Sequence, residues 1–254
     1  MPAISIVIVC RNEAAIIAQT LQSLQGVSDD IIVYDNGSTD GTQQIVLQQK
    51  ARLEEGSWEG FGKTKNKANA LAKHDWILSL DADEAIDEDL KKSLLVLQPA
   101  DEKTVYDLSF RSFLGKKGLQ YGEWGSDHHV RLFNRKWVSW NDAPVHEELQ
   151  LPDGCRVVKL KGLVLHKTMA DIKDYAAKMA GYAMLNAEKY FRQGKKASWI
   201  KLRLSPGFTF FHYYILKRGF LDGYEGYICA RMTAYYTFLK YTRLKELNNT
   251  STES

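Results

Sequence analysis

ISIVIVC, residues 4–10, is an unbroken apolar run rich in β-branched side chains, and Arg11-Asn12-Glu13 follows it directly. A short run of this kind is typical of a strand that is buried on both faces of a parallel sheet. DIIVY at 30–34 and WILSL at 76–80 have the same character, and residues 14–25 between the first two runs show helical spacing. Strand and helix signals in alternation predict an α/β fold, with a Rossmann-like, mainly parallel central sheet flanked by helices.

Polar clusters follow all three strand signals. They are Arg11-Asn12-Glu13, Asp35-Asn36-Gly37-Ser38 and Asp81-Ala82-Asp83-Glu84. In open parallel sheets, ligands bind beyond the carboxyl ends of the strands. We therefore expect the three clusters to converge on one binding site at one edge of the sheet.

The pattern changes after the first hundred residues. Residues 104–166 indicate a mixture of loops and strands, with strands expected at 105–113, 129–134, 156–160 and 163–166. The last third is helical, and its clearest periodic helix covers 175–191. Four glycines are expected to divide the aromatic region that follows into short pieces: Gly207, Gly219, Gly223 and Gly226.

We expect two domains from this organisation. The first domain covers 1–170, in two parts of about 1–100 and about 101–170. A helical, basic and aromatic extension covers 171–254, with a disordered tail from about 247.

Composition excludes several classes of protein. Of the 254 residues 44% are hydrophobic and 26% charged, which is ordinary for a globular protein and excludes wholesale disorder. Cys10, Cys155 and Cys229 are too scattered for a disulfide framework or a zinc-binding pair, and they fit a reducing compartment. The sequence shows no secretory signal and no apolar run long enough for a transmembrane helix, so we expect a cytoplasmic protein.

Charge is unevenly spread along the chain. Residues 1–191 carry a net charge of −4, whereas residues 192–254 carry +7 and are rich in aromatic side chains. Two interpretations of this basic end remain open, namely packing of short helices in a core and peripheral contact with the anionic inner face of the cytoplasmic membrane. Nucleic-acid binding is disfavoured, because the first part of the chain is acidic and carries no nucleic-acid motif.

Asp81 and Asp83 stand one residue apart at a strand end. Two carboxylates so placed can hold Mg²⁺ or Mn²⁺ between themselves and a diphosphate, since both ions prefer hard oxygen ligands. The alternative is an acidic helix start, because six acids lie between residues 81 and 89.

Asp35 likewise suits either a base or ribose contact or an ordinary Asx turn. The basic stretch around Lys63, Lys65 and Asn66 suits either phosphate contacts or a solvated helix start.

Four motifs in order carry a resemblance to a known family: SIVIVCRNE, VYDNGSTDGT, KTKNKANALA and WILSLDADE. Together they resemble the family 2 glycosyltransferases, which have the glycosyltransferase A fold. The resemblance covers about residues 3–100 and continues more loosely through RLFNRKW, PVHEEL and LVLHKT. That later part is similar to the branch that includes bacterial lipopolysaccharide core β-glucosyltransferases.

The resemblance implies that 1–170 is the catalytic domain, with a nucleotide-sugar half over about 1–100 and an acceptor half over about 101–170. It also implies roles for particular residues. Nucleotide contacts fall on Arg11, Asn12 and Glu13, base recognition on Asp35 and Asn36, and further donor contacts on Lys65, Asn66, Asp81 and Ala82. Many members have Asp where this chain has Asn36, which leaves the choice of nucleotide open. The metal-binding acidic pair falls on Asp81 and Asp83, with Asp83 as the expected direct ligand. His166, after the strand signal LVLH, is expected either to complete the metal site or to be structural.

Family 2 enzymes mostly invert the anomeric centre by direct displacement, with a carboxylate as base. The Glu-Asp motif that supplies this base in many members is absent here. We expect Glu147 to be the base, with Glu148, His146 and Asp142 behind it, while a solvated acidic edge is the alternative reading.

The sequence thus predicts a metal-dependent, inverting glycosyltransferase. We expect a UDP-hexose donor such as UDP-glucose, and a saccharide or glycolipid acceptor of the bacterial cell envelope such as the lipopolysaccharide inner core. Two alternatives stay open: a nucleotidyltransferase that makes a sugar nucleotide, and a non-catalytic scaffold that binds one. The first lacks the expected glycine-rich loop after the first strand, where this chain has CRNEAA.

Overall fold

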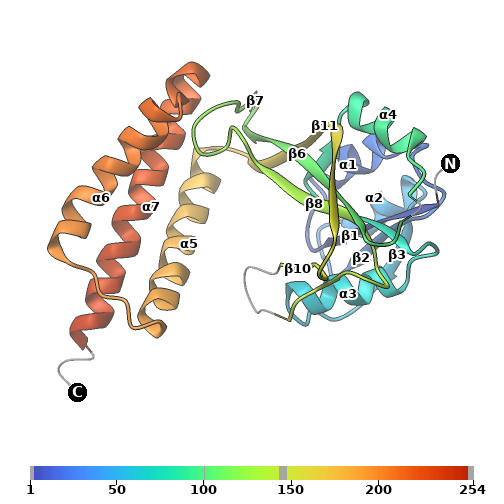
Figure 1. Cartoon of the computed structure of the whole chain (residues 1–254), viewed down its shortest axis with the longest axis horizontal. Coiled ribbons are helices and arrows are strands. Elements are labelled where there is room, and N and C mark those ends of the chain that lie inside the picture. The colour runs from blue at the N-terminus through green and yellow to red at the C-terminus, as the bar shows by residue number, and fades with distance from the viewer. Residues whose placement is uncertain (1–2, 100, 143–147, 251–254) are drawn as a thin grey trace. The chain divides into compact units, whose positions relative to one another are not determined.

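A computed structural model describes residues 3–99, 101–142 and 148–250. The chain forms two compact units (Figure 1). We call them the sheet unit, residues 1–110 and 127–166, and the helical unit, residues 111–126 and 167–254. The predicted domain boundary at residue 170 and the division into donor and acceptor halves remain predictions.

Four parallel strands form one side of the central sheet, in the order β3-β2-β1-β4. Their bounds are β1 Ile4–Cys10, β2 Ile31–Asp35, β3 Arg52–Glu55 and β4 Trp76–Asp81. Alternate residues of β1 pack on opposite faces of the sheet, Ile6 and Ile8 in one core cluster and Val7 in another. The strand is therefore buried on both faces, as its unbroken apolar sequence predicts, and the α/β fold class is confirmed.

The sheet continues from β4 through β8, β6, β11 and β5. The bounds are β5 Glu84–Ile86, β6 Thr104–Leu114, β8 His128–Asn134 and β11 Arg156–Met169. The short β7, Lys117–Gly118, pairs with β6, while β9, Ser139–Trp140, pairs with β10, Leu149–Gln150. The two strands expected at 156–160 and 163–166 form one strand, β11, which runs through Gly162 without a break. A Cβ atom at Gly162 would lie 2.0 Å from the Leu90 nitrogen, so only glycine permits this approach.

Helices of the sheet unit connect the strands. They are α1 Ile17–Ser23, α2 Thr42–Gln48, α3 Phe61–Ala70 and α4 Glu88–Val96. The Asp87 side chain caps α4 by accepting a hydrogen bond of 2.7 Å from the Leu90 nitrogen. Glu88 and Asp89 occupy the first turn of α4, so the acidic run has a helix-starting role at its far end.

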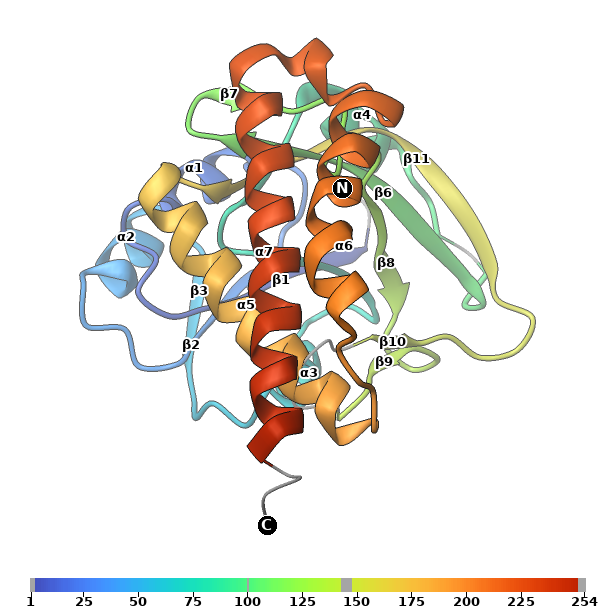
Figure 2. The ribbon, with the colours of Figure 1, turned by 90° about the vertical axis from the view of Figure 1, so that its left-hand side faces the viewer.

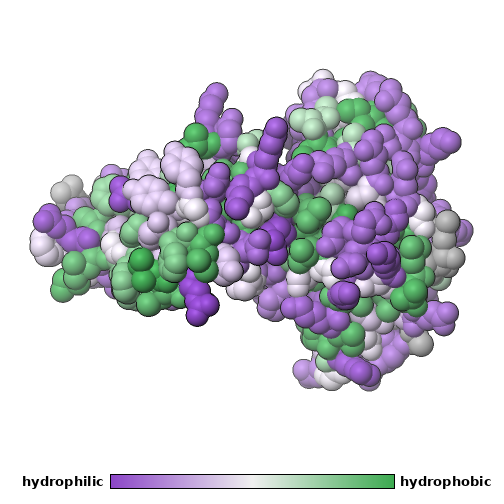
Figure 3. All heavy atoms as spheres, turned by 90° about the horizontal axis from the view of Figure 1, so that it is seen from above, coloured by the Kyte–Doolittle hydropathy of each residue, from purple (hydrophilic) through white to green (hydrophobic). Residues whose placement is uncertain are grey.

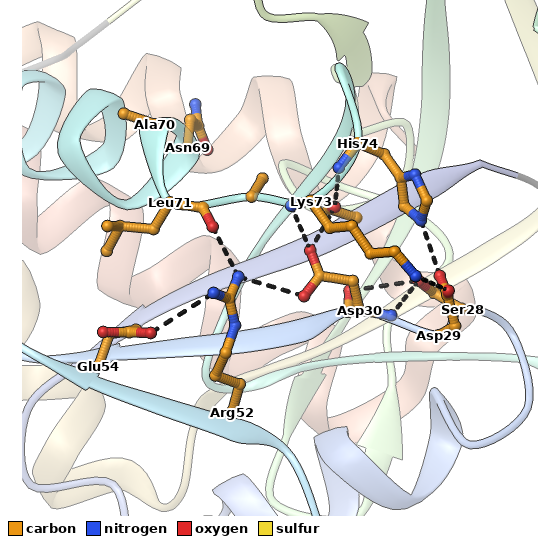
Figure 4. Close-up of polar contacts among 12 residues, drawn as sticks. Ser28, Asp29, Asp30, Arg52, Glu54, Asn69, Ala70, Leu71, Lys73 and His74 are labelled. Carbon is orange, nitrogen blue, oxygen red and sulfur yellow. Dashed lines mark hydrogen bonds and ion pairs between the residues drawn. The ribbon is translucent and has the colours of Figure 1, made fainter.

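A buried carboxylate ties together the loops before β2 and β4 (Figure 4). Asp30 accepts hydrogen bonds from the Ser5 hydroxyl at 2.5 Å and from the Lys73 nitrogen at 2.7 Å. Arg52 donates a third at 3.2 Å. This cluster lies before the strands begin, at the opposite end from the three polar clusters that follow them.

Asp30→Ala is expected to lower the free energy of unfolding by about 3 kcal/mol, because it leaves the buried Ser5 hydroxyl and the half-buried Lys73 nitrogen without their acceptor. Urea unfolding of both proteins tests this. Asp29→Ala is the matched control: its exposed carboxylate bonds Lys73 and His74, and its loss should change stability little. Equal effects of the two substitutions would contradict the role given to Asp30.

Three long helices make up most of the helical unit. They are α5 Ile172–Arg192, α6 Trp199–Phe211 and α7 Gly223–Thr250, and α7 lies between the other two (Figures 1 and 2). A π-helical turn η1, His212–Leu216, and a 3₁₀ turn η2, Gly219–Asp222, connect α6 to α7. α7 continues beyond residue 247, where the sequence predicts the start of a disordered tail.

The glycines of this unit only partly divide it. Gly219 and Gly223 mark the break before α7, but Gly207 lies inside α6 and Gly226 inside α7, so the expectation of short pieces is wrong there. A Cβ atom at Gly226 would lie 1.9 Å from the Gly219 carbonyl oxygen. Gly226 therefore permits close backbone packing rather than ending the helix.

Among the residues that the structure describes, no helix is long and apolar enough to cross a membrane. The three cysteines are free, with Cys10 and Cys229 buried.

Candidate functional site

The three polar clusters lie together at the carboxyl ends of β1, β2 and β4, as expected. We call this side of the sheet its edge. Strand register places Cys10 beside Asp35 and Val9 beside Asp81. A hollow of about 360 Å³ opens at this edge. We call it the donor hollow, and it is lined by Val9, Cys10, Arg11, Glu13, Asn36, Trp58, Phe61, Lys65, Asp81, Ala82 and Asp83.

The loop after β1 is fastened to the loop after β2. The Asn12 nitrogen donates to the Ser38 hydroxyl at 2.8 Å, and the Asn12 side-chain oxygen accepts from the Thr39 nitrogen at 2.8 Å. The Glu13 nitrogen donates to the Thr42 hydroxyl at 2.8 Å. Asn12 thus holds the rim in place, while Arg11 and Glu13 line the donor hollow.

Asp35 is fully buried and is engaged by its own loop. Its carboxylate accepts hydrogen bonds from the Ser38 nitrogen at 2.9 Å, the Ser38 hydroxyl and the Gln43 amide at 2.8 Å. Burial raises the pKa of Asp35, but the bonds from Ser38 and Gln43 outweigh it and hold the pKa below its ordinary value. The Asx-turn reading therefore describes the observed contacts of this residue.

Asn36, next to Asp35, presents a different picture. Its amide nitrogen donates to the Gly56 carbonyl at 3.1 Å, which fixes the orientation of the side chain. The amide oxygen is buried and has no hydrogen-bond partner among the described residues, and Asn36 lines the donor hollow. A buried acceptor without a partner is costly, so the site suits a ligand that brings a donor.

Asp81 is held by two cations. Lys65 Nζ lies 3.2 Å from one carboxylate oxygen and Arg131 Nη2 lies 3.3 Å from the other. Burial raises the pKa of Asp81, but the charges of Lys65 and then Arg131 outweigh it and hold the pKa well below its ordinary range. Asp81 is therefore ionised and neutralised by its neighbours.

Arg131 also contacts a second carboxylate. Its Nη2 atom lies 2.7 Å from Glu84, which is completely buried and accepts a 2.9 Å hydrogen bond from the Asp81 nitrogen. Burial raises the pKa of Glu84 to about 7, and the charge of Arg131 opposes that shift. Arg131 thus joins the strand that ends in Asp81 to the strand that begins with Glu84.

Asp83 and His166 form the other half of the acidic site. The Asp83 carboxylate lies 3.4 Å from His166 Nε2, and Asp83 lines the donor hollow. Burial lowers the pKa of His166, but the carboxylates of Asp83, Glu84 and Asp81 outweigh it and raise the pKa above its ordinary value. Within the described residues, no group of three or more His, Cys, Asp and Glu side chains is placed to hold a metal ion by itself.

Lys65 lies between the donor hollow and a second hollow. The second hollow has a volume of about 350 Å³, and we call it the neighbouring hollow. Both are lined by Lys65 and Asp81, and Lys65 Nζ also sits 4.6 Å from the centre of the Trp140 ring. Asn66 lines neither: its side chain donates to the Trp140 carbonyl at 2.8 Å and accepts from the Trp140 nitrogen at 3.0 Å.

Of the four candidate bases, Glu148 and Asp142 lie within the described residues. His146 and Glu147 lie outside the described residues. Glu148 is exposed and lines the neighbouring hollow, with its nitrogen bonded to the Asn141 side chain at 3.2 Å. Asp142 is exposed.

Sequence reasoning gave no role to four residues of this region. Arg131 is a charged residue between the apolar residues Val130 and Leu132 of β8, and that contrast was the available signal. Glu84 was named only as part of a polar cluster, because it reads as one more acid in an acidic run. Trp58 and Phe61 line the donor hollow as an edge-on pair with ring centres 4.7 Å apart, and they lie on the loop and helix start between two recognised motifs.

The glycosyl transferase family 2 model matches residues 5–145. An uncharacterized glycosyltransferase of Rickettsia typhi is 26% identical over 98% of this chain and 88% of its own length. The lipopolysaccharide core biosynthesis glycosyltransferase LpsC of Rhizobium meliloti is 27% identical over 93% of this chain and 89% of its own length.

Solved structures give weaker likenesses. Glucosyl-3-phosphoglycerate synthase from Mycobacterium tuberculosis, in complex with Mn²⁺, UDP and glucosyl-3-phosphoglycerate, is 25% identical with a TM-score of 0.32, and the match covers 44% of each chain. TarS of Staphylococcus aureus is 16% identical with a TM-score of 0.43, over 94% of this chain and 55% of that one.

Proposed function

Because the chain belongs to glycosyl transferase family 2, we propose that it transfers a hexose, with inversion, from a UDP-sugar to a saccharide of the bacterial cell envelope. The observation that carries this proposal is the donor hollow at the ends of β1, β2 and β4, where Asp83 stands beside His166 and Lys65 beside Asp81. The family match removes support from the nucleotidyltransferase alternative.

We assign recognition of the uracil base to Asn36 in the donor hollow. Uracil carries an N–H donor at N3, whereas cytosine has an acceptor there. The unpartnered Asn36 oxygen, fixed by the bond to Gly56, supports a preference for the uracil donor. Asp35 then contributes indirectly, by holding its own loop in place. Trp58 and Phe61 offer aromatic rings at the opening of the donor hollow.

The two side chains at the position proposed for the diphosphate could serve as ligands of a divalent cation. One carboxylate and one imidazole, Asp83 and His166, leave most positions of the coordination sphere to diphosphate oxygens and water, as Mg²⁺ prefers and Mn²⁺ accepts. A bound cation would neutralise the charge that develops on the departing UDP. Asp81, already paired with two cations, is better placed to hold Lys65 at the edge of the donor hollow.

The transfer itself is a single displacement. A carboxylate, Glu147 in our assignment, takes the proton from an acceptor hydroxyl. The hydroxyl oxygen attacks the anomeric carbon from the face opposite UDP, the new glycosidic bond forms, and the bond to the diphosphate breaks with its electron pair leaving on UDP. Lys65, which lines the donor hollow beside Asp81, would supply a positive charge next to the leaving group.

The neighbouring hollow is assigned to the acceptor. It shares Lys65 and Asp81 with the donor hollow, and it offers Trp140, His129 and Glu148 to a sugar. The likeness to LpsC, whose name places it in lipopolysaccharide core biosynthesis, supports a core saccharide as acceptor.

A donor panel tests the proposal. We expect UDP-glucose to be consumed with a truncated core acceptor in preference to CDP-, GDP- and ADP-glucose, measured as release of the nucleoside diphosphate. Asn36→Ala should narrow the preference for UDP-glucose over CDP-glucose about tenfold, the value of one hydrogen bond. The ratio within one variant cancels any general loss of binding. Preference for another nucleotide, or no release from any donor, would contradict the proposal.

A further inference from the structure

An exposed apolar stripe runs along α6. Ile200, Leu204, Phe208 and Phe211 follow one another at steps of four, four and three residues, which places them on one helix face. Their exposed fractions are 63%, 65%, 65% and 48%, and α6 contains no buried residue at all. Ile215 and Leu216 extend the stripe into η1 with 43% and 56%. The stripe is about 24 Å long at the rise of a helix.

The opposite face of α6 already has a partner. Thr209 bonds Thr237 of α7 at 3.4 Å, and the Phe210 ring meets the Tyr227 ring with centres 5.9 Å apart. Within the helical unit the stripe therefore faces away from α7. Figure 3 shows hydrophobic side chains gathered on the helical part of the chain, at the left of that view. An apolar surface of this extent marks an interaction site.

Along the chain, the charged residues on either side of the stripe are basic from residue 189 to residue 221. Residues 189–221 contain no Asp or Glu and eight basic residues: Lys189, Arg192, Lys195, Lys196, Lys201, Arg203, Lys217 and Arg218. The basic residues stand before and after the apolar centre, because none lies between 204 and 216. Two copies of this face brought together would repel each other, whereas an anionic surface would attract it.

We propose that α6 and η1 dock on an anionic lipid bilayer. The helix lies in the plane of the interface, the stripe enters the boundary between headgroups and acyl chains, and the flanking Lys and Arg contact lipid phosphates. The inference goes beyond the proposed function and does not depend on the chemistry at Asp83.

Vesicle sedimentation with the full chain tests the proposal. We expect binding to vesicles of phosphatidylcholine with one third phosphatidylglycerol, at least tenfold weaker binding to pure phosphatidylcholine, and loss of binding as salt rises. Leu204→Gln with Leu216→Gln should weaken binding to anionic vesicles at least tenfold. Lys201→Glu with Lys217→Glu should weaken it by a similar factor.

Leu47→Gln with Leu185→Gln is the matched control, since these leucines are 60% and 51% exposed on α2 and α5. It should bind vesicles as the unchanged chain does. Equal weakening by both leucine pairs would overturn the proposal, as would the absence of vesicle binding. So would a stable dimer in light scattering that only the change at Leu204 and Leu216 dissolves. Stabilisation by UDP, measured on each variant, reports folding and the donor hollow separately from lipid binding.

Discussion

Asp83→Ala is expected to lower the rate of sugar transfer about a thousandfold, roughly 4 kcal/mol of transition-state stabilisation. Asp83 lines the donor hollow, and its carboxylate lies 3.4 Å from His166 Nε2. Removing it takes away the oxygen ligand of the proposed cation, so charge on the leaving UDP would build up uncompensated. Steady-state release of UDP from UDP-glucose measures the effect.

Asp89→Ala serves as the matched control for Asp83. Asp89 is a half-exposed acid in the same acidic run, in the first turn of α4, and it does not line either hollow. It should leave turnover within a factor of two or so. Full activity of Asp83→Ala, or equal losses in both variants, would remove Asp83 from the mechanism.

The second large effect concerns the base. Glu147→Gln is expected to lower kcat by about 10²–10⁴ while donor binding is unchanged, because the amide keeps the shape of the side chain but cannot take a proton. Glu148→Gln is the neighbouring control and should cost far less. Rates at saturating UDP-glucose and acceptor, with UDP affinity measured separately, distinguish the two.

The opposite order of effects would contradict the assignment of Glu147. A loss confined to Glu148→Gln would place the base on the described residue that lines the neighbouring hollow. A change in UDP affinity without a change in kcat would make Glu147 a binding residue.

The convergence of polar residues at the carboxyl ends of β1, β2 and β4 could be predicted, because the sequence signals for it are local. Each of β1, β2 and β4 is a short apolar run with polar residues directly after it, and parallel pairing brings those ends together whatever the rest of the chain does. Asp83 was found this way and lines the donor hollow. Lys65 was named from a basic stretch and the family resemblance, and it lines the same hollow from α3.

The contacts of these residues could not be predicted, because their partners come from distant segments. Arg131 on β8 reaches Asp81 and Glu84 only after β8 pairs with β4. Glu84 reads as the start of an acidic helix, yet it opens β5 and is buried against β11. Local sequence shows which residues are charged, but the sheet order decides which charges meet.

Asp35 shows a different limit. The sequence allowed either a ligand contact or an Asx turn, and both readings rest on the same few residues. The structure shows the turn, in which Ser38 and Gln43 donate to the Asp35 carboxylate. The acceptor without a partner among the described residues is instead the Asn36 side-chain oxygen. The distinction depends on side-chain orientation, which no local pattern encodes.

Thermal unfolding in the presence of nucleoside diphosphates tests the central claim most directly, namely that the edge formed by β1, β2 and β4 binds UDP together with a divalent cation. A ligand that binds the native state raises the melting temperature by mass action. We predict that UDP with Mn²⁺ raises it, that UDP alone and CDP, GDP or ADP with Mn²⁺ raise it much less, and that the rise disappears in Asp83→Ala. No rise with UDP and Mn²⁺, or an equal rise in Asp83→Ala, would contradict the account.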